Sequence, residues 1–251
     1  DAFVAAFRIP NLLRDLFAEG ALSAAYVPVF TDRLKKDGTQ RAFLVTSSIF
    51  SILLVVLGII VVLGVALAPY YIRYYVSGFD DPARLELTIK LTRIMFPFIL
   101  LVAFAAVSMG TLNALGRFGI PALAPAMFNI VMIMSALFAS TYFDPPIIAI
   151  GIGAVVGGAG QFIIQLPQLL KTGYRFRFRL NFKDEAVRKI LRLILPAAMG
   201  VAAWQVNVVV ATVIASFLAV GSISSLYYAL RLVHFPLGVF GVALAAVSLP
   251  E

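Results

Sequence analysis

The sequence predicts an all-α fold, a bundle of transmembrane helices that crosses the membrane several times. Apolar residues make up 62% of the chain and charged residues only 13%, and the mean hydropathy is +1.00, far outside the range of soluble domains. The apolar residues form continuous runs long enough to cross a bilayer as helices, which takes about 20 residues. Transmembrane β-strands alternate in polarity over about ten residues, and these runs do not.

The apolar runs predict seven membrane spans, each bounded by short polar or charged segments. The chain opens on Asp1 inside a helical pattern and stops at Glu251 with no tail, so we expect it to be part of a longer protein. The predicted spans are Asp1 to Phe30, Phe43 to Tyr70, Ile94 to Leu115, Pro121 to Tyr142, Ile147 to Leu170, Ile190 to Ala219 and Leu226 to Leu249.

The net charge of +8 follows the membrane topology and gives nucleic acid no role as a partner. If successive spans cross the membrane in alternating directions, 13 of the 20 Lys and Arg residues fall on one side of the membrane and 4 on the other. The remaining three, Arg8, Arg14 and Arg231, lie within apolar segments. Because cytoplasmic loops carry the excess of Lys and Arg, the basic side is predicted to be cytoplasmic.

The residues needed for most enzyme and metal chemistry are missing from the sequence. It contains no cysteine and a single histidine, His234, which excludes disulfides, thiolate catalysis and zinc sites built on histidine pairs. No pairing of serine with histidine, no catalytic carboxylate pair and no phosphate-binding lysine loop is found. We therefore expect a protein that is not an enzyme and holds no metal.

Small and amide residues in the spans are predicted to pack helices against one another. The cluster GIGAVVGGAG, residues 151–160, lacks the spacing and flanking strand of a dinucleotide-binding loop, and small residues let transmembrane helices approach closely. Asn129, Gln161 and Gln165 are expected to form hydrogen bonds between helices.

The segment from Lys171 to Lys189 alternates basic and aromatic residues and then becomes amphipathic. One interpretation is a cytoplasmic segment that lies among anionic phospholipid headgroups. The other is an ordinary basic linker between two groups of helices. The sequence leaves both interpretations open.

The first predicted span carries its polar residues on one face. At about 100° per residue, these side chains share an arc about 140° wide, with Pro10 expected to kink the helix. An arginine facing lipid at the bilayer centre costs at least about 2.5 to 3.5 kcal/mol, so the arc is expected to face a protein interior or a wet cavity. Snorkelling of Arg8 to the headgroups, or its neutralisation by Asp15 two turns on, stays open. The arc contains Asp1, Arg8, Asn11, Arg14, Asp15 and Glu19.

Arg231 in the last span has no carboxylate within a turn of it. It lies on a polar stripe with Ser224, Tyr227, Tyr228 and His234. An unpaired intramembrane arginine is a candidate anion site, because its planar guanidinium makes bidentate bonds to phosphate. The alternative is an arginine bonded to helix-end carbonyls near the membrane surface.

Four segments resemble the MurJ (MviN) family, the bacterial lipid II flippases of the multidrug/oligosaccharidyl-lipid/polysaccharide exporter superfamily. The resemblance covers nearly the whole chain, and its first and last motifs are the most specific. The segments, in the family's order, are DAFVAAFRIPNLLRDLFAEGALSAAYVPVF, LNALGRFGIPALAPAMFNI, QLPQLLKTG and YYALRLVHFPLGVFGVALAAVSLP.

The resemblance implies a fold of fourteen helices, in two six-helix lobes and a final pair around a central cavity. This chain would hold about seven of them, from the second to the eighth. Residues 1–170 would form most of the N-terminal lobe, 171–189 a basic amphipathic cytoplasmic linker, and 190–251 the first two helices of the C-terminal lobe. The implied activity is transport of lipid II, an undecaprenyl-diphosphate-linked disaccharide peptide, from the inner to the outer leaflet of the bacterial cytoplasmic membrane by alternating access.

The resemblance also assigns site residues. Asp1 matches a functional Asp, Arg14 an essential cavity Arg, and Arg231 the cavity Arg of the eighth helix. Arg8 and Glu19 match positions that are commonly basic and acidic, and His234 stands where some relatives have an acidic residue, which would make the charge near Arg231 sensitive to pH.

The resemblance to sodium-coupled members is incomplete. Those members use a carboxylate on the seventh helix, where this sequence offers only Gln205 and Asn207, which argues against sodium coupling. No cofactor is expected. The expected partners are lipid II, anionic phospholipids at the basic segment and cell-wall synthesis proteins.

Two other classes of function stay open, a related exporter of another substrate and a membrane scaffold that does not transport. An exporter of another polyprenyl-diphosphate oligosaccharide would share the diphosphate, whereas a drug exporter should line its cavity with carboxylates and aromatic residues. A membrane scaffold that recruits cell-wall enzymes through the basic segment would not need Arg14 and Arg231.

Overall fold

The fold is all-α, as predicted. The structure is a computed structural model that describes residues 1–15 and 21–236, and it contains no β-strand within those residues. Short π and 3-10 segments, Ser135–Ala139 and Ser140–Tyr142, extend α5. The α-helices are α1 (Ala2–Arg14), α2 (Ala21–Tyr75), α3 (Pro82–Met95), α4 (Phe98–Ala114), α5 (Gly119–Met134), α6 (Ile147–Ile163), α7 (Leu166–Lys171), α8 (Glu185–Ser216) and α9 (Ser222–Pro236).

Four of the described helices are long and apolar enough to cross a membrane: Leu22–Tyr75, Pro82–Ala114, Gly119–Tyr142 and Ile147–Lys171. A fifth is reached if the two halves of α8, which are bent by 46°, count as one span. The first and last predicted spans run into residues 16–20 and 237–251, outside the described residues. The chain is therefore a multi-pass membrane protein.

Helix α2 contains the end of the first predicted span and the whole of the second. Its 55 residues would measure about 80 Å as one rod, far more than a hydrocarbon core of about 30 Å. Gly38 interrupts it with φ of +78°, a conformation that glycine adopts without strain. Residues 21–37 therefore contain the end of the first predicted span and extend beyond Phe30, and residues 39–75 contain the second predicted span.

The third span is longer than predicted because the polar helix before it joins it. Asp81 caps α3, its carboxylate accepting a hydrogen bond of 2.9 Å from the backbone N–H of Ala83. The hydroxyls of Thr88 and Thr92 donate to carbonyls one turn back, at 2.8 Å each. These bonds let both threonines lie buried, so the span extends from Pro82 to Ala114.

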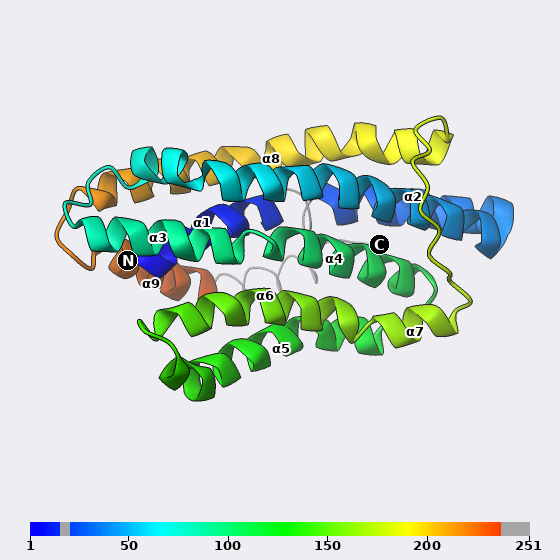
Figure 1. Cartoon of the computed structure of the whole chain (residues 1–251). Helices are drawn as coiled ribbons and strands as arrows, with labels where there is room; N and C mark the ends of the chain where they lie inside the picture. Colours follow the sequence, from blue (N-terminus) through cyan, green and yellow to red (C-terminus); the bar gives the residue numbers. More distant parts are fainter. Residues whose placement is uncertain (16–20, 237–251) are drawn as a thin grey trace.

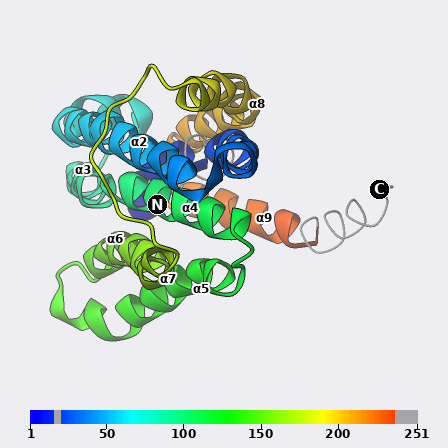
Figure 2. The same cartoon turned by 90° about the vertical axis from the view of Figure 1, so that its right-hand side faces the viewer.

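The helices run side by side with their connections gathered at two ends (Figures 1 and 2). The segments predicted to be cytoplasmic are the bend within α2, the α4–α5 connection and the α7–α8 connection, and they lie together at the right-hand end of Figure 1. The α2–α3 and α8–α9 connections lie at the other end. The spatial arrangement thus agrees with the side assignments made from charge. Below, the two ends are called the basic end and the outer end.

Glycines of α6 bring three helices into close contact, as the sequence indicated. A Cβ at Gly153 would lie 2.6 Å from the Cβ of Ser135, and one at Gly158 would lie 2.7 Å from the ring of Phe98. Gln165 donates to the carbonyl of Ala105 at 3.2 Å, a bond between helices. Asn129, for which the same role was predicted, is exposed.

The basic segment crosses the end of the bundle without forming a helix over residues 172–184, and α8 already begins at Glu185. Tyr174 is buried against the rings of Phe43 and Phe50, and its hydroxyl accepts a hydrogen bond from Ser47 at 3.2 Å. The side chains of Arg175 and Arg177 are exposed. Phe176 and Phe178 are 51% and 61% exposed, so Tyr174 alone among these alternating aromatic residues is buried in the bundle.

Candidate functional site

The polar face of α1 lines a cavity of about 510 Å³ between α1, α5, α8 and α9. Arg8, Asn11 and Arg14 contribute from α1, and Tyr227 and Arg231 from α9. Helix α1 continues through Pro10 without interruption, so these side chains keep their helical spacing. Among the described residues that line the cavity, three are arginines and none is acidic. The other lining residues are Phe3, Val4, Phe7, Phe128, Val208 and Leu230.

Arg14 is held by the carboxylate next to it in the chain. Its Nη2 and Nε donate to Oδ1 of Asp15 at 2.8 and 3.1 Å. Oδ2 of Asp15 accepts a hydrogen bond of 3.0 Å from the side-chain amide of Gln205 on α8. Asp15 therefore orients Arg14 and links α1 to α8. It does not neutralise Arg8, which was one of the alternatives left open by the sequence.

Arg8 and Arg231 share one aromatic neighbour. The guanidinium carbon of Arg8 lies 6.0 Å from the ring centroid of Tyr227, and that of Arg231 lies 5.3 Å from it. Both distances are within the range of cation–π attraction, about 6 Å. Neither arginine forms an ion pair with a carboxylate within the described residues. Their charge is therefore available to an anion in the cavity.

Asp1 lies away from this cavity, at the outer end of the bundle. Its carboxylate accepts hydrogen bonds from the backbone N–H of Gly221 at 2.6 Å, the backbone N–H of Ser224 at 2.9 Å and the hydroxyl of Ser224 at 2.8 Å. These donors form the N-terminus of α9, where the helix dipole favours a negative charge. Asp1 thus joins the start of α1 to the start of α9.

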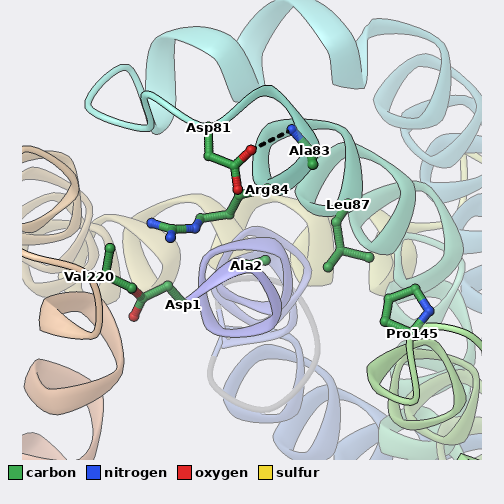
Figure 3. Close-up of a pocket in the computed structure, with 8 residues that line it drawn as sticks. All are labelled: Asp1, Ala2, Asp81, Ala83, Arg84, Leu87, Pro145 and Val220. Carbon is green, nitrogen blue, oxygen red and sulfur yellow. Dashed lines mark hydrogen bonds between the residues drawn. The ribbon is translucent and has the colours of Figure 1, made fainter.

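Asp1 lines a second cavity of about 510 Å³ (Figure 3). Arg84 extends from α3 toward Asp1 in this view, and Val220 of the α8–α9 connection lies beside it. Close by, Ser216 at the end of α8 accepts a hydrogen bond of 3.2 Å from the backbone N–H of Gly78. The outer end is therefore closed by contacts of α1 and the α2–α3 connection with the end of α8 and the start of α9.

Two of the predicted site residues cannot be placed. Glu19 lies outside the described residues. The backbone of His234 belongs to α9, but its side chain is outside what the structure describes. No cluster of three or more His, Asp or Glu residues that could hold a metal occurs within residues 1–15 and 21–236.

Sequence reasoning missed the bond between Asp15 and Gln205 and the role of Ser224. Asp1 and Asp15 were both recognised as polar residues of the first span, but their partners lie 223 and 190 residues away. The available signal was that polar residues lie within the apolar spans. A polar side chain in such a span needs a hydrogen-bond partner, but the sequence does not say which residue on another span provides it.

Comparison with known proteins identifies the family. The sequence model described as "Lipid II flippase MurJ" matches residues 1–251. The chain belongs to the lipid II flippase MurJ family. It is 38% identical over 258 residues to the probable lipid II flippase MurJ of Haemophilus influenzae and 35% identical over 256 residues to the lipid II flippase MurJ of Burkholderia cenocepacia. Both alignments cover 100% of the chain, and 51% and 50% of these relatives.

A solved structure of the same family has a similar fold. It shows a lipid II flippase MurJ in an inward closed conformation and matches 98% of the chain with a TM-score of 0.81 and 28% sequence identity. The match covers 50% of that protein, so the chain spans about half the length of its MurJ relatives. The relatives are named as flippases, which are transporters, and this agrees with the prediction that the protein is not an enzyme.

Proposed function

We propose that the full-length protein moves lipid II from the inner to the outer leaflet of the bacterial cytoplasmic membrane, and that Arg8, Arg14 and Arg231 bind its diphosphate. The observation that carries this proposal is the cavity with three arginines and no acidic residue among its described lining. Arginine suits a diphosphate because its planar guanidinium makes paired, charge-assisted hydrogen bonds to phosphate oxygens.

The energetic cost of the arginines favours a ligand in this cavity. Each arginine near the middle of the bilayer costs at least about 2.5 to 3.5 kcal/mol on insertion scales. Asp15 offsets the cost of the charge of Arg14 but not that of the other two arginines. Tyr227 offsets only part of the cost of Arg8 and Arg231, since an exposed cation–π contact contributes about 0.5 to 1 kcal/mol. An anionic headgroup would supply the missing compensation. A cationic drug would be repelled.

We also propose that transport proceeds by alternating access with Asp1 as part of the outer gate. The three hydrogen bonds that the Asp1 carboxylate accepts from the start of α9 hold the outer end closed. Opening toward the outside would separate α1 from α9 and break these bonds. The similar MurJ structure was solved in an inward closed conformation, and the closed outer end of this chain fits such a state.

Further partners belong to the same proposal. The exposed Arg175 and Arg177 of the basic segment are suited to anionic phospholipids of the cytoplasmic leaflet. Cell-wall synthesis proteins are the expected protein partners. We do not propose sodium as the driving ion, because α8 offers only Gln205 and Asn207 where a carboxylate is expected, and the amide of Gln205 is bonded to Asp15.

Growth complementation tests the function. The chain, completed to the length of its relatives, would be expressed in a bacterium depleted of its own lipid II flippase. We expect the wild type to restore growth, and Arg14→Ala and Arg231→Ala to fail at equal membrane levels. Arg117→Ala, on the exposed α4–α5 connection at the basic end, is the matched control and should restore growth. Rescue by all variants would refute the arginine site, and failure of the wild type would point to another lipid-linked sugar.

A further inference from the structure

Tyr227 lies between two arginines that come from different helices. Arg231 follows it by one turn on α9, and Arg8 reaches it from α1. All three residues line the cavity of about 510 Å³. Both guanidinium groups therefore lie over the same aromatic ring, one reaching it from α1 and the other from α9.

The two guanidinium groups repel each other and need compensation. The negative face of an aromatic ring attracts cations, and Tyr227 provides such a ring to both. The compensation is incomplete, because the buried Nε of Arg8 has no hydrogen-bond partner within the described part of the chain. A buried donor of this kind is costly unless a ligand or water accepts from it. The ring of Tyr227 thus holds two guanidinium groups in place, and the Nε–H of Arg8 stays free to donate to a ligand.

We propose that Tyr227 is a positioning residue that sets the separation of Arg8 and Arg231, so that the cavity prefers two linked phosphates to one. The inference rests on the proposed function, because it concerns the same anion site. Arginine side chains are long and lose considerable conformational freedom when ordered. A tyrosine has only two side-chain torsions. Contact with its ring therefore orders both guanidinium groups before the ligand arrives, which improves affinity for a ligand that engages both.

Binding of two inorganic anions tests this role. Inorganic pyrophosphate and orthophosphate would each be titrated into the full-length protein, with the shift of the unfolding midpoint giving the dissociation constant. We expect the wild type to prefer pyrophosphate. Tyr227→Leu should weaken pyrophosphate binding about tenfold, as expected when cation–π contacts to two arginines are lost, and should leave orthophosphate binding nearly unchanged. Tyr227→Phe should keep the preference, because it keeps the ring.

Tyr142→Leu is the matched control. Tyr142 follows α5, is 85% exposed and does not line the cavity, so its loss should change neither dissociation constant. Tyr227→Met keeps the bulk without an aromatic ring and replaces the leucine variant if the latter does not fold.

The outcomes separate this inference from the function itself. If Arg231→Ala weakens pyrophosphate binding while Tyr227→Leu and Tyr227→Met keep the preference over orthophosphate, the anion site stands and the positioning role is overturned. If the wild type binds neither anion, or if Arg14→Ala and Arg231→Ala bind both as the wild type does, the proposed function fails together with the inference.

Discussion

The carboxylate of Asp1 accepts hydrogen bonds from both the backbone N–H and the hydroxyl of Ser224, 223 residues along the chain. With the third bond, from the N–H of Gly221, it ties the start of α1 to the start of α9. Gly221 has φ of +98°, a conformation that favours glycine and that turns its N–H toward the carboxylate. One acidic residue thus connects α1 to α9, the two helices that the proposed outward opening would separate.

Replacing Asp1 should loosen the outer end. Loss of a capping carboxylate costs about 0.5 to 2 kcal/mol, so Asp1→Ala should shift the population toward an open outer end. The chain has no cysteine, and spin labels at Ala83→Cys and Val220→Cys, both exposed beside Asp1, would report the change as a longer distance. Asp80→Ala removes an exposed acid nearby and should leave the distance unchanged. The gate is refuted if both variants give the wild-type distance.

Gln205→Leu should weaken the link between α1 and α8. It removes the 3.0 Å hydrogen bond to Asp15 from a site where Gln205 is only 8% exposed. We expect a loss of about 1 to 3 kcal/mol in unfolding free energy, and slower transport because Arg14 is oriented less well. Asn207→Leu, at an exposed position of the same helix, is the control for adding a leucine to α8. Equal unfolding midpoints for the two variants would contradict the structural role of the bond.

Gly153→Ala should destabilise the packing of α6 although alanine is the better helix former. Its methyl group would lie 2.6 Å from the Cβ of Ser135, and such overpacking costs about 1 to 3 kcal/mol. Gly160→Ala in the same helix meets nothing closer than Val131 at 3.9 Å, so it should be neutral or stabilising by up to about 1 kcal/mol. Thermal unfolding of the purified protein measures both. Similar effects of the two substitutions would mean that α6 does not pack as described.

Tyr174 should make the fold sensitive to strongly alkaline pH. Its burial raises the pKa of the phenol to about 12, with the hydrogen bond from Ser47 opposing the shift. Because the folded state favours the neutral phenol, the stabilisation is complete below pH about 10 and is lost as the pH rises through 12. Between pH 9 and 12 the wild type should lose up to about 2 kcal/mol more than Tyr174→Phe, which keeps the ring and cannot ionise. An identical loss in both proteins would exclude Tyr174 as the cause.

The sequence predicted the features that depend on spacing along one helix. The polar arc of α1 was predicted from its period, and Arg8, Asn11 and Arg14 line one cavity as expected. The close packing at Gly153 and Gly158 was predicted from their small size in an apolar span. The two ends of the bundle were predicted from the distribution of charge.

Features that depend on which helices meet were not predicted. The partners of Asp1 and Asp15 lie on α9 and α8, and periodicity gives the face of a helix but not its neighbour. Asp15 could pair with Arg8 by spacing, yet bonds to the adjacent Arg14 because α8 presents Gln205 there. The joining of α3 to the third span was missed because Thr88 and Thr92 satisfy their hydroxyls within the helix and are buried.

Transport of lipid II in reconstituted vesicles tests the central claim most directly. Fluorescent lipid II would be placed in vesicles with the full-length protein, and its arrival in the outer leaflet followed by quenching with a reductant that does not cross the membrane. We predict rapid quenching of the inner pool for the wild type and for Arg117→Ala, and a rate close to that of protein-free vesicles for Arg14→Ala and Arg231→Ala. Equal rates for the wild type and both cavity variants would contradict the assignment of these arginines to lipid II transport.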